Sequence, residues 1–184
     1  THGLGISMWD GITTPVNLLE EAGFELKTEL TGMFVELNQL DQPKDTLEII
    51  RVKNSLEASV WASLFQQAFG YRIDSYTVLK TSLEVSYFIA THKGRQVGTA
   101  VLYHHIPAVA GIHSMGIVPE MRRKGYAREL LLTILKMAQA QDAKFATLQA
   151  SAMGKGLYLS TGFQEQFQFK TFTNKTQNNN ESNR

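Results

Sequence analysis

Between residues 47 and 172 the apolar positions repeat with two different periods, and the period changes along the chain. Runs with a period near two predict strands at residues 47–52, 85–91, 96–106, 112–118, 145–150 and 163–169. Runs in which apolar residues recur every three or four positions predict helices at residues 55–69, 75–83, 127–138 and 156–161. The resulting order, β-α-α-β-β-β-α-β-α-β, predicts a mixed central sheet flanked by helices, with a helical crossover between two parallel neighbours.

The ends of two elements carry signals of their own. Asn54 offers an N-cap with Glu57 at the capping-box position, and Gly70 ends the same helix. Pro119 ends the strand before it, because proline cannot continue a central ladder. The residues that precede this strand, 107–111, are expected to form a loop.

The composition is that of an ordinary globular protein, and it excludes several classes of function. Of the 184 residues, 43% are hydrophobic and 19% are charged, which suits a single domain with a sizeable core. Lysine plus arginine (18) nearly balance aspartate plus glutamate (17), so a nucleic acid is not expected as a partner.

The chain contains no cysteine, which excludes disulfides, a thiolate nucleophile and a cysteine-ligated metal. No apolar run approaches the ~20 residues of a membrane span, so no membrane partner is expected. These features predict a soluble, cytoplasmic protein. The polar, asparagine-rich tail at residues 173–184 is expected to be disordered.

The segment with the clearest chemistry runs from Met115 to Ala127, between a predicted strand and the most regular helix. A loop that enters a helix presents unpaired N–H groups at the positive end of the helix dipole, which suits a pyrophosphate. Gly125 allows phosphates to approach, and three side chains, Arg122, Arg123 and Lys124, add mobile positive charge. The alternative is a basic loop that is merely solvated.

This segment resembles the acyl-CoA motif of the GNAT superfamily of acyl-CoA-dependent N-acyltransferases. The run Met115–Pro119, followed by Arg122-x-x-Gly125-x-Ala127, is similar to the family's R/Q-x-x-G-x-G/A loop. Leu157–Phe163 is similar to its second motif, a tyrosine on a short helix followed by Gly-Phe. The resemblance covers residues 47–172 and implies an α/β (α+β) fold whose fourth and fifth strands splay apart around the cofactor.

The resemblance also implies which residues bind acetyl-CoA. Backbone groups of Met115 and Ile117 would bond the pantetheine arm, and N–H groups from Arg123 to Arg128 would hold the pyrophosphate. Ser151 stands where the family often has an asparagine that contacts the cofactor. The expected cofactor-binding residues are Met115, Gly116, Ile117, Arg122, Arg123, Lys124, Gly125, Tyr126, Ala127, Arg128 and Ser151.

The implied reaction is acetyl transfer from acetyl-CoA to an amine by direct attack in a ternary complex, without a metal. Tyr158 matches the family tyrosine that points at the cofactor sulfur, and it would be the general acid. The N–H of Ile117 would stabilise the oxyanion. His113 is the candidate general base because histidine titrates near neutrality, with His104, His105 and a water chain as alternatives.

Two other functions stay open at this point. A GNAT fold can retain acyl-CoA without turnover, as a sensor or partner module, although the presence of Tyr158 favours an enzyme. A plain nucleotide-binding loop is disfavoured, since neither the Walker nor the Rossmann glycine pattern is present. The acceptor, a small molecule or a peptide, is not readable from the sequence, and both a monomer and a homodimer remain possible.

Residues 1–46 carry a shorter pattern, in which Thr14-Pro15 starts a helix, Gly23 ends it, and 32–37 is β-like. The stretch Leu18–Phe24 has the same length and the same Gly-Phe ending as Leu157–Phe163. One interpretation is an unrelated extension. The other is the closing end of a degenerate, truncated GNAT-like repeat whose upstream part is missing or lost.

In the repeat hypothesis, the N-terminal segment forms a strand-helix-strand unit. Ile6–Trp9 would then pair near Met33–Leu37, and the unit would flank the acceptor cleft.

Overall fold

The computed structural model describes residues 4–9 and 16–174 of the chain. Its elements, in chain order, are β1 (Gly5–Trp9), α1 (Val16–Glu21), β2 (Phe24–Glu36), β3 (Glu48–Arg51), α2 (Ser55–Phe69), α3 (Ser75–Thr81), β4 (Ser86–His92), β5 (Arg95–Ile106), β6 (Val109–Ile117), the 3-10 turn η1 (Pro119–Met121), α4 (Tyr126–Gln139), β7 (Phe145–Ala150), α5 (Ala152–Leu159) and β8 (Gln164–Asn174). The strands form one eight-stranded sheet in the order β1-β8-β2-β7-β6-β5-β4-β3, which confirms the predicted mixed α/β architecture.

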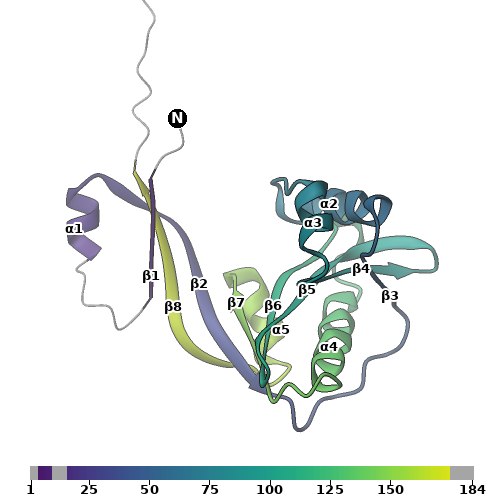
Figure 1. Ribbon diagram of the computed structural model, residues 1–184. Coiled ribbons are helices and arrows are strands. Elements are labelled where there is room, and N and C mark those ends of the chain that lie inside the picture. The colour runs from purple at the N-terminus through teal and green to yellow at the C-terminus, as the bar shows by residue number, and fades with distance from the viewer. Residues whose placement is uncertain (1–3, 10–15, 175–184) are drawn as a thin grey trace, which may run out of the picture.

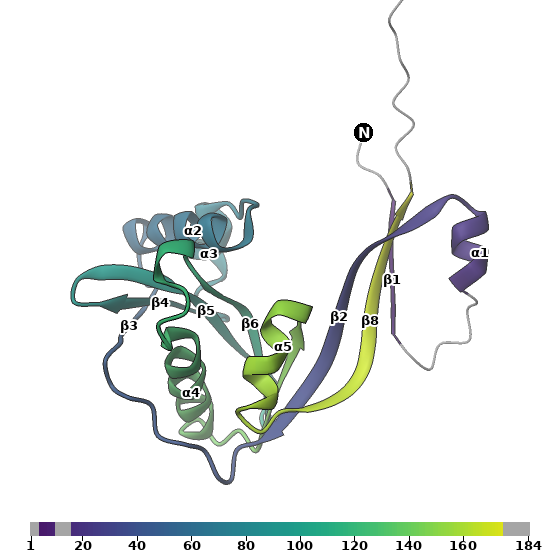
Figure 2. The same ribbon diagram turned by 180° about the vertical axis from the view of Figure 1, so that it is seen from behind.

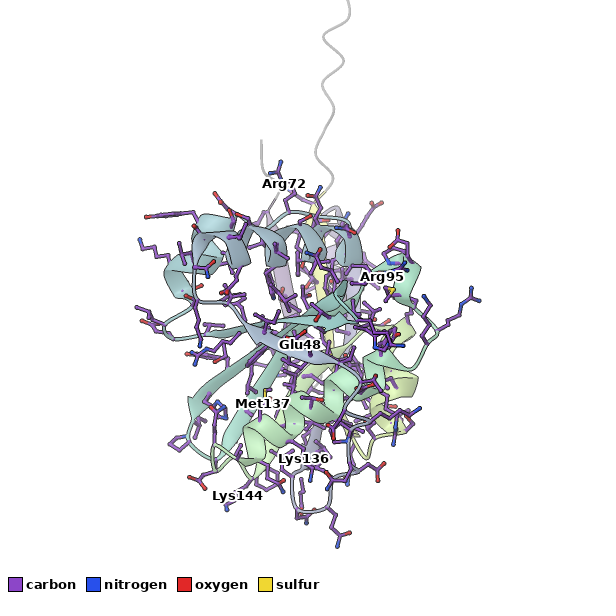
Figure 3. All side chains as sticks on the ribbon, turned by 90° about the vertical axis from the view of Figure 1, so that its right-hand side faces the viewer. Glu48, Arg72, Arg95, Lys136, Met137 and Lys144 are labelled. Carbon is purple, nitrogen blue, oxygen red and sulfur yellow. The ribbon has the colours of Figure 1, made fainter. Side chains whose placement is uncertain are left out.

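Helices lie on both faces of the sheet, and one end of the sheet extends as an arm (Figure 1). Helix α2 contacts β4, β5 and β6 on one face, and α4 contacts β5 and β6 on the other. Figure 3 shows this layering from the β3 edge, where Glu48 lies between the layer that carries Arg72 and the helix that carries Lys136 and Met137. The arm consists of β1, β8 and β2, with α1 at its far end (Figure 2).

The two long helices bury most of the faces that their apolar periods predict, although Leu56, the first apolar position of α2, is exposed. Helix α4 buries leucine, isoleucine and alanine side chains, and α2 buries Trp61 and Phe65, which stack at 5.2 Å between ring centroids. Asn54 caps α2, because its side chain accepts a hydrogen bond from the Glu57 N–H at 2.9 Å. Gly70 ends the helix with a left-handed φ of 82°. These boundaries confirm the sequence signals.

The N-terminal segment forms the predicted strand-helix-strand unit, but its pairing differs from the prediction. Ile6–Trp9 pairs with Phe169–Phe172 of β8, and not with Met33–Leu37. Strand β2 instead lies between β7 and β8, where Met33 pairs with Leu148. The prediction was wrong because pairing between distant strands is set by the tertiary fold. Thr14 and Pro15 lie outside the described residues.

Three boundaries also differ from the prediction. Strand β6 begins at Val109, so the expected 107–111 loop shrinks to a turn, because Val109 can still pair with Ile106. Helix α5 begins at Ala152, earlier than predicted, since its glycines hide the helical pattern. Thr173 and Asn174, which were expected to open a disordered tail, belong to β8 because β1 and β2 supply pairing partners.

A buried carboxylate connects the segment before β3 to α4. Glu129, in the first turn of α4, is 4% exposed. Its side chain accepts hydrogen bonds from the Thr46 hydroxyl at 2.7 Å and from the N–H groups of Thr46 and Leu47 at 2.5 and 2.7 Å. This cluster fixes the segment between β2 and β3 beside the start of α4.

Glu129→Ala should therefore lower the free energy of unfolding by about 1–3 kcal/mol, because donors that the carboxylate satisfied lose their acceptor. Chemical denaturation followed by circular dichroism measures this difference. Glu120→Ala is the matched control, since Glu120 is exposed near the same helix start. Equal stability of the two variants would show that the Glu129 bonds contribute little.

Candidate active site

The two central parallel strands separate partway along their length. β6 and β7 pair at Val109–Phe145, Ala110–Ala146 and Gly111–Thr147, and no later pair joins them. β6 nevertheless continues to Ile117, still paired with β5. Counted from β3, these are the fourth and fifth strands, so the predicted splay is confirmed. The edge of β6 beyond Gly111 therefore has backbone groups with no strand partner on the β7 side among the described residues.

A bulge in β6 accompanies the separation. The register with β5 shifts between Thr99 and Val101, and Ser114 adopts a positive φ of 49°. The buried Thr99 hydroxyl donates a hydrogen bond to the Ser114 carbonyl at 2.9 Å. A bulge bends its strand and redirects the backbone groups that follow. Thr99 was not identified from the sequence, because the contact joins two strands.

The loop after β6 leads into helix α4, whose N-terminus has no capping side chain. Gly125 is the N-cap of α4, with a φ of 85° and no side-chain capping bond. A β-carbon at Gly125 would meet no heavy atom within 4 Å. The first N–H groups of α4 therefore have no capping side chain at the positive end of the helix dipole, an arrangement that fits an anion such as a pyrophosphate.

Two cations of this loop hold its shape. The Arg122 guanidinium donates to the carbonyls of Ile117 and Ala68, both at 3.0 Å, so it links the end of β6 to the end of α2. The Lys124 ammonium donates to the Glu120 carbonyl at 2.9 Å. The sequence predicted mobile charges at both positions. That expectation was wrong, because backbone carbonyls exposed by the loop bind these side chains.

The other two cations differ in their environment. Arg128 forms an ion pair with Asp41 at 2.5 Å and donates to the Ser160 carbonyl at 3.1 Å, which ties α4 to the end of α5. Arg123 is exposed, with a positive φ of 59°. Within the described part of the chain, no hydrogen bond or ion pair holds its side chain. Arg123 is therefore available to an anion at the N-terminus of α4.

Gly116 has a packing role that the sequence did not reveal. A β-carbon there would lie 2.6 Å from the Phe69 ring and 2.9 Å from the Ala68 β-carbon. Glycine thus lets the end of α2 approach β6. Met115, Tyr126 and Ala127, three other predicted cofactor contacts, are partly buried against the core.

Tyr158 projects from α5 into the core and is 8% exposed. Its ring packs edge-on against Phe163, with centroids 5.6 Å apart. Gly154, one turn earlier, leaves room for this ring, since a β-carbon would lie 3.2 Å from a Tyr158 ring carbon. Burial raises the pKa of Tyr158 to about 12. The hydroxyl is therefore neutral and able to donate a proton or hydrogen bond at any physiological pH.

Ser151 caps the helix that carries Tyr158. Its hydroxyl oxygen accepts a hydrogen bond from the Gly154 N–H at 3.3 Å. This cap starts α5 at Ala152, earlier than the sequence predicted.

His113 lies on the face of the sheet that packs against α2. It pairs with Val101, and its ring lies over Gly111, where a β-carbon would be 2.7 Å from the histidine Nε2. Burial lowers the pKa of His113 below 6.5, so the imidazole is mostly neutral at pH 7. The ring lines a cavity of about 170 Å³ that also touches Thr147, at the vertex of the splay.

Tyr158 lies on the face of the sheet opposite to His113. Gly162, in the turn after α5, lies against Val35, and Val35 pairs with Ala146 of β7. Ala146 points away from its neighbour Thr147, because successive side chains alternate between the faces of a strand. The gap between β6 and β7 therefore has the Tyr158 helix on one face and His113 on the other.

His104, one of the two alternative histidines, does not lie beside His113. His104 pairs with Ala110 and lines a separate cavity of about 460 Å³, together with Asp142 beyond the C-terminal end of α4. It therefore lies on the opposite face from Tyr103 and His113. The side chain of His105 lies outside the described residues.

None of the helices in residues 4–9 and 16–174 has the length and apolar character needed to span a membrane. The same residues contain no group of three or more histidine, cysteine, aspartate or glutamate side chains arranged to hold a metal.

Comparison with known proteins agrees with the geometry. A family model described as an acetyltransferase (GNAT) domain matches residues 84–165, which span β4 to the start of β8. No curated protein matches the chain.

Solved structures share its fold at low sequence identity. A GCN5-related N-acetyltransferase from Kribbella flavida has a TM-score of 0.74 and 16% identity, over 95% of this chain and 69% of its own. One from Sphaerobacter thermophilus has a TM-score of 0.73 and 17% identity, over 93% of this chain and 59% of its own. A GNAT-family acetyltransferase from Colwellia psychrerythraea has a TM-score of 0.63 and 13% identity, over 93% and 65%. At these identities the likeness establishes the fold.

The position of His113 depends on Gly111, which gives a test independent of any activity. Gly111→Ala should displace the imidazole toward solvent, because the new β-carbon would sit 2.7 Å from Nε2 and the ring can rotate away. The pKa of His113 should then rise toward 6.5, as measured by NMR titration. Gly156→Ala, at a glycine with no neighbour within 4 Å, is the control. An unchanged pKa would contradict the packing of His113 over Gly111.

Proposed function

We propose that the chain is an enzyme of the GNAT superfamily, whose acetyltransferase domain model matches residues 84–165, and that it transfers an acetyl group from acetyl-CoA to an amine by direct attack in a ternary complex. One observation carries this proposal: the partner-free edge of β6 lies next to the uncapped N-terminus of α4. A long, partly peptidic thioester with a pyrophosphate needs both features at once. The cytoplasmic location expected from the sequence remains a prediction.

The donor would be held mainly by backbone groups. Its pantetheine arm would follow the edge of β6 from Met115 to Ile117, in place of the absent β7 partner. Its pyrophosphate would accept hydrogen bonds from the N–H groups after Gly125, with Arg123 adding charge. Arg122 and Lys124 would act indirectly, by holding the loop.

The chemical step needs a base, an oxyanion donor and an acid. We assign the base to His113, which would accept a proton from the acceptor ammonium. The neutral amine then attacks the thioester carbonyl, forming a C–N bond and an oxyanion that the Ile117 N–H would stabilise, typically by ~2.7–4 kcal/mol. The C–S bond breaks, and the thiolate takes a proton from Tyr158. The nitrogen of the new amide loses its second proton to solvent, Tyr158 regains a proton from solvent, and His113 releases its own.

Both pKa shifts keep the two groups in the protonation states from which these roles start. A base must be neutral to accept a proton, and the lowered pKa keeps His113 neutral at pH 7. An acid must be protonated, and a pKa of about 12 keeps the Tyr158 hydroxyl protonated. In addition, the two groups lie on opposite faces of the gap. His113 could therefore accept a proton from the amine while Tyr158 donates one to the sulfur.

Release of CoA thiol in the presence of acetyl-CoA and a panel of amines tests the proposal. Amine-dependent thiol release, with the N-acetylated product identified by mass spectrometry, is the expected outcome. Binding of acetyl-CoA with no thiol release for any amine would instead favour a non-catalytic acyl-CoA-binding module.

Gly125→Glu should weaken acetyl-CoA binding by about two orders of magnitude or more, because a carboxylate would face the pyrophosphate at the helix N-terminus. Isothermal titration calorimetry gives the Kd. Gly23→Glu is the matched control: its φ of 82° imposes similar strain to the 85° of Gly125, and it lies between α1 and β2. Equal affinity of the two folded variants would overturn the pyrophosphate assignment.

Tyr158→Phe should reduce kcat by about 10²-fold or more while changing the Kd for acetyl-CoA by less than about twofold, since a general acid acts in the transition state. Steady-state kinetics and calorimetry separate the two effects. Tyr76→Phe, on the exposed face of α3, serves as the control. Turnover of Tyr158→Phe at the wild-type rate across the pH range would exclude the acid role.

A further inference from the structure

A row of paired residues crosses the sheet at the vertex of the splay. Tyr103 of β5 pairs with Gly111 of β6, Gly111 with Thr147 of β7, and Thr147 with Phe34 of β2. Laterally paired residues point to the same face of a sheet, so Tyr103, Thr147 and Phe34 share the face on which His113 lies. The surface next to the proposed base is therefore defined by four strands, β5, β6, β7 and β2, rather than by a loop.

The cavity beside His113 has mostly apolar or uncharged walls. It has a volume of about 170 Å³, and its lining residues are Tyr103, Ile106, Val109, Gly111, His113 and Thr147. A cavity of about 150 Å³ is enough to hold one benzene molecule. The volume of this open cavity is therefore close to that of a single ring-sized group.

Aromatic side chains extend this surface beyond Thr147. The rings of Phe34 and Phe145 lie 6.4 Å apart and tilted by 46°, and Phe145 pairs laterally with Val109 of the cavity. Farther along, the Phe167 ring covers Gly32, where a β-carbon would lie 2.5 Å from it. Phe145 and Phe167 are each 37% exposed. An apolar path thus continues from the cavity across β7 and β2.

Charge is the second distinguishing property of this surface. None of the cavity residues is an aspartate, glutamate, lysine or arginine. The nearest carboxylate along the pairing is Glu36, opposite Phe145, and it is exposed and accepts a hydrogen bond from Asn38 at 3.0 Å. A second ammonium group in the cavity would lose its hydration without gaining a counter-ion, which is strongly unfavourable.

We infer that the acceptor is a primary amine with one ring-sized apolar group, such as an arylalkylamine, rather than a polyamine or an amino sugar. This inference rests on the proposed function, because it takes His113 as the base that faces the amine. The ring would lie against Ile106, Val109 and Tyr103, with the amino group toward His113 and the splay. Any longer substituent would follow the Phe34 and Phe145 rings.

The inference can be tested at Ile106, which ends β5 and is 56% exposed, so substitution there should leave the fold intact. The probes are phenethylamine, 1,5-diaminopentane and kanamycin, titrated by calorimetry into the full chain saturated with CoA. Wild-type protein should bind phenethylamine at least about tenfold more tightly than either polycation, because the cavity lacks a counter-ion for a second charge.

Ile106→Glu should reverse this preference, weakening phenethylamine and strengthening the diamine, since a carboxylate would replace an apolar wall. Ile106→Gln separates charge from shape and should weaken phenethylamine without strengthening the diamine. Leu83→Glu, at an apolar residue that is 91% exposed between α3 and β4, is the control and should bind like the wild type.

The outcomes separate this inference from the proposed function. Tighter binding of 1,5-diaminopentane or kanamycin by the wild type, or no binding of phenethylamine, would overturn the acceptor class even if some other amine were acetylated. Equal effects of Ile106→Glu and Leu83→Glu would also overturn it. Phenethylamine binding with the predicted variant pattern, but without thiol release from acetyl-CoA, would support the cavity as an amine site and refute the transferase.

Discussion

The site depends on the loss of one set of strand hydrogen bonds, where β6 and β7 part after the Gly111–Thr147 pair. Each strand can leave the other because its opposite edge is satisfied: β6 pairs with β5, and β7 pairs with β2. The bulge at Ser114 and its bond from Thr99 hold β6 in its diverging course. Unpaired backbone groups are costly when buried, so a gap of this kind favours a ligand that can hydrogen-bond to a strand.

Around this gap, side chains act mainly as supports. Arg122 joins the end of β6 to α2, Arg128 joins α4 to α5, and Glu129 fixes the segment before β3 against the same helix. The start of α4 is thereby held while its first N–H groups stay open. Such preorganisation matters because donors fixed before a ligand arrives need no reorganisation when charge develops.

The two faces of the sheet have different chemistry at the gap. The α5 side supplies the buried hydroxyl of Tyr158, and the α2 side supplies His113 with an uncharged, partly aromatic surface. The aromatic part comes from strands far apart in the chain, since Phe34 belongs to β2 and Phe145 to β7. The N-terminal segment is thus part of the central sheet and contributes directly to the surface beside the candidate base.

The sequence by itself determined the elements with strong local signals: the capped helix from Asn54, the apolar stripe of α4, the strand at 145–150 and the glycine loop before α4. It also indicated Tyr158 and His113, because one lies in a motif and the other on the strand that precedes the loop. Only the tertiary structure decided that β2 inserts between β7 and β8, that Arg122 binds carbonyls, and that His113 and His104 face opposite sides. The physical reason is the distance along the chain over which each effect acts. Apolar periods and helix caps depend on residues within one or two turns, whereas strand pairing, strand register and side-chain burial depend on residues far apart in the chain.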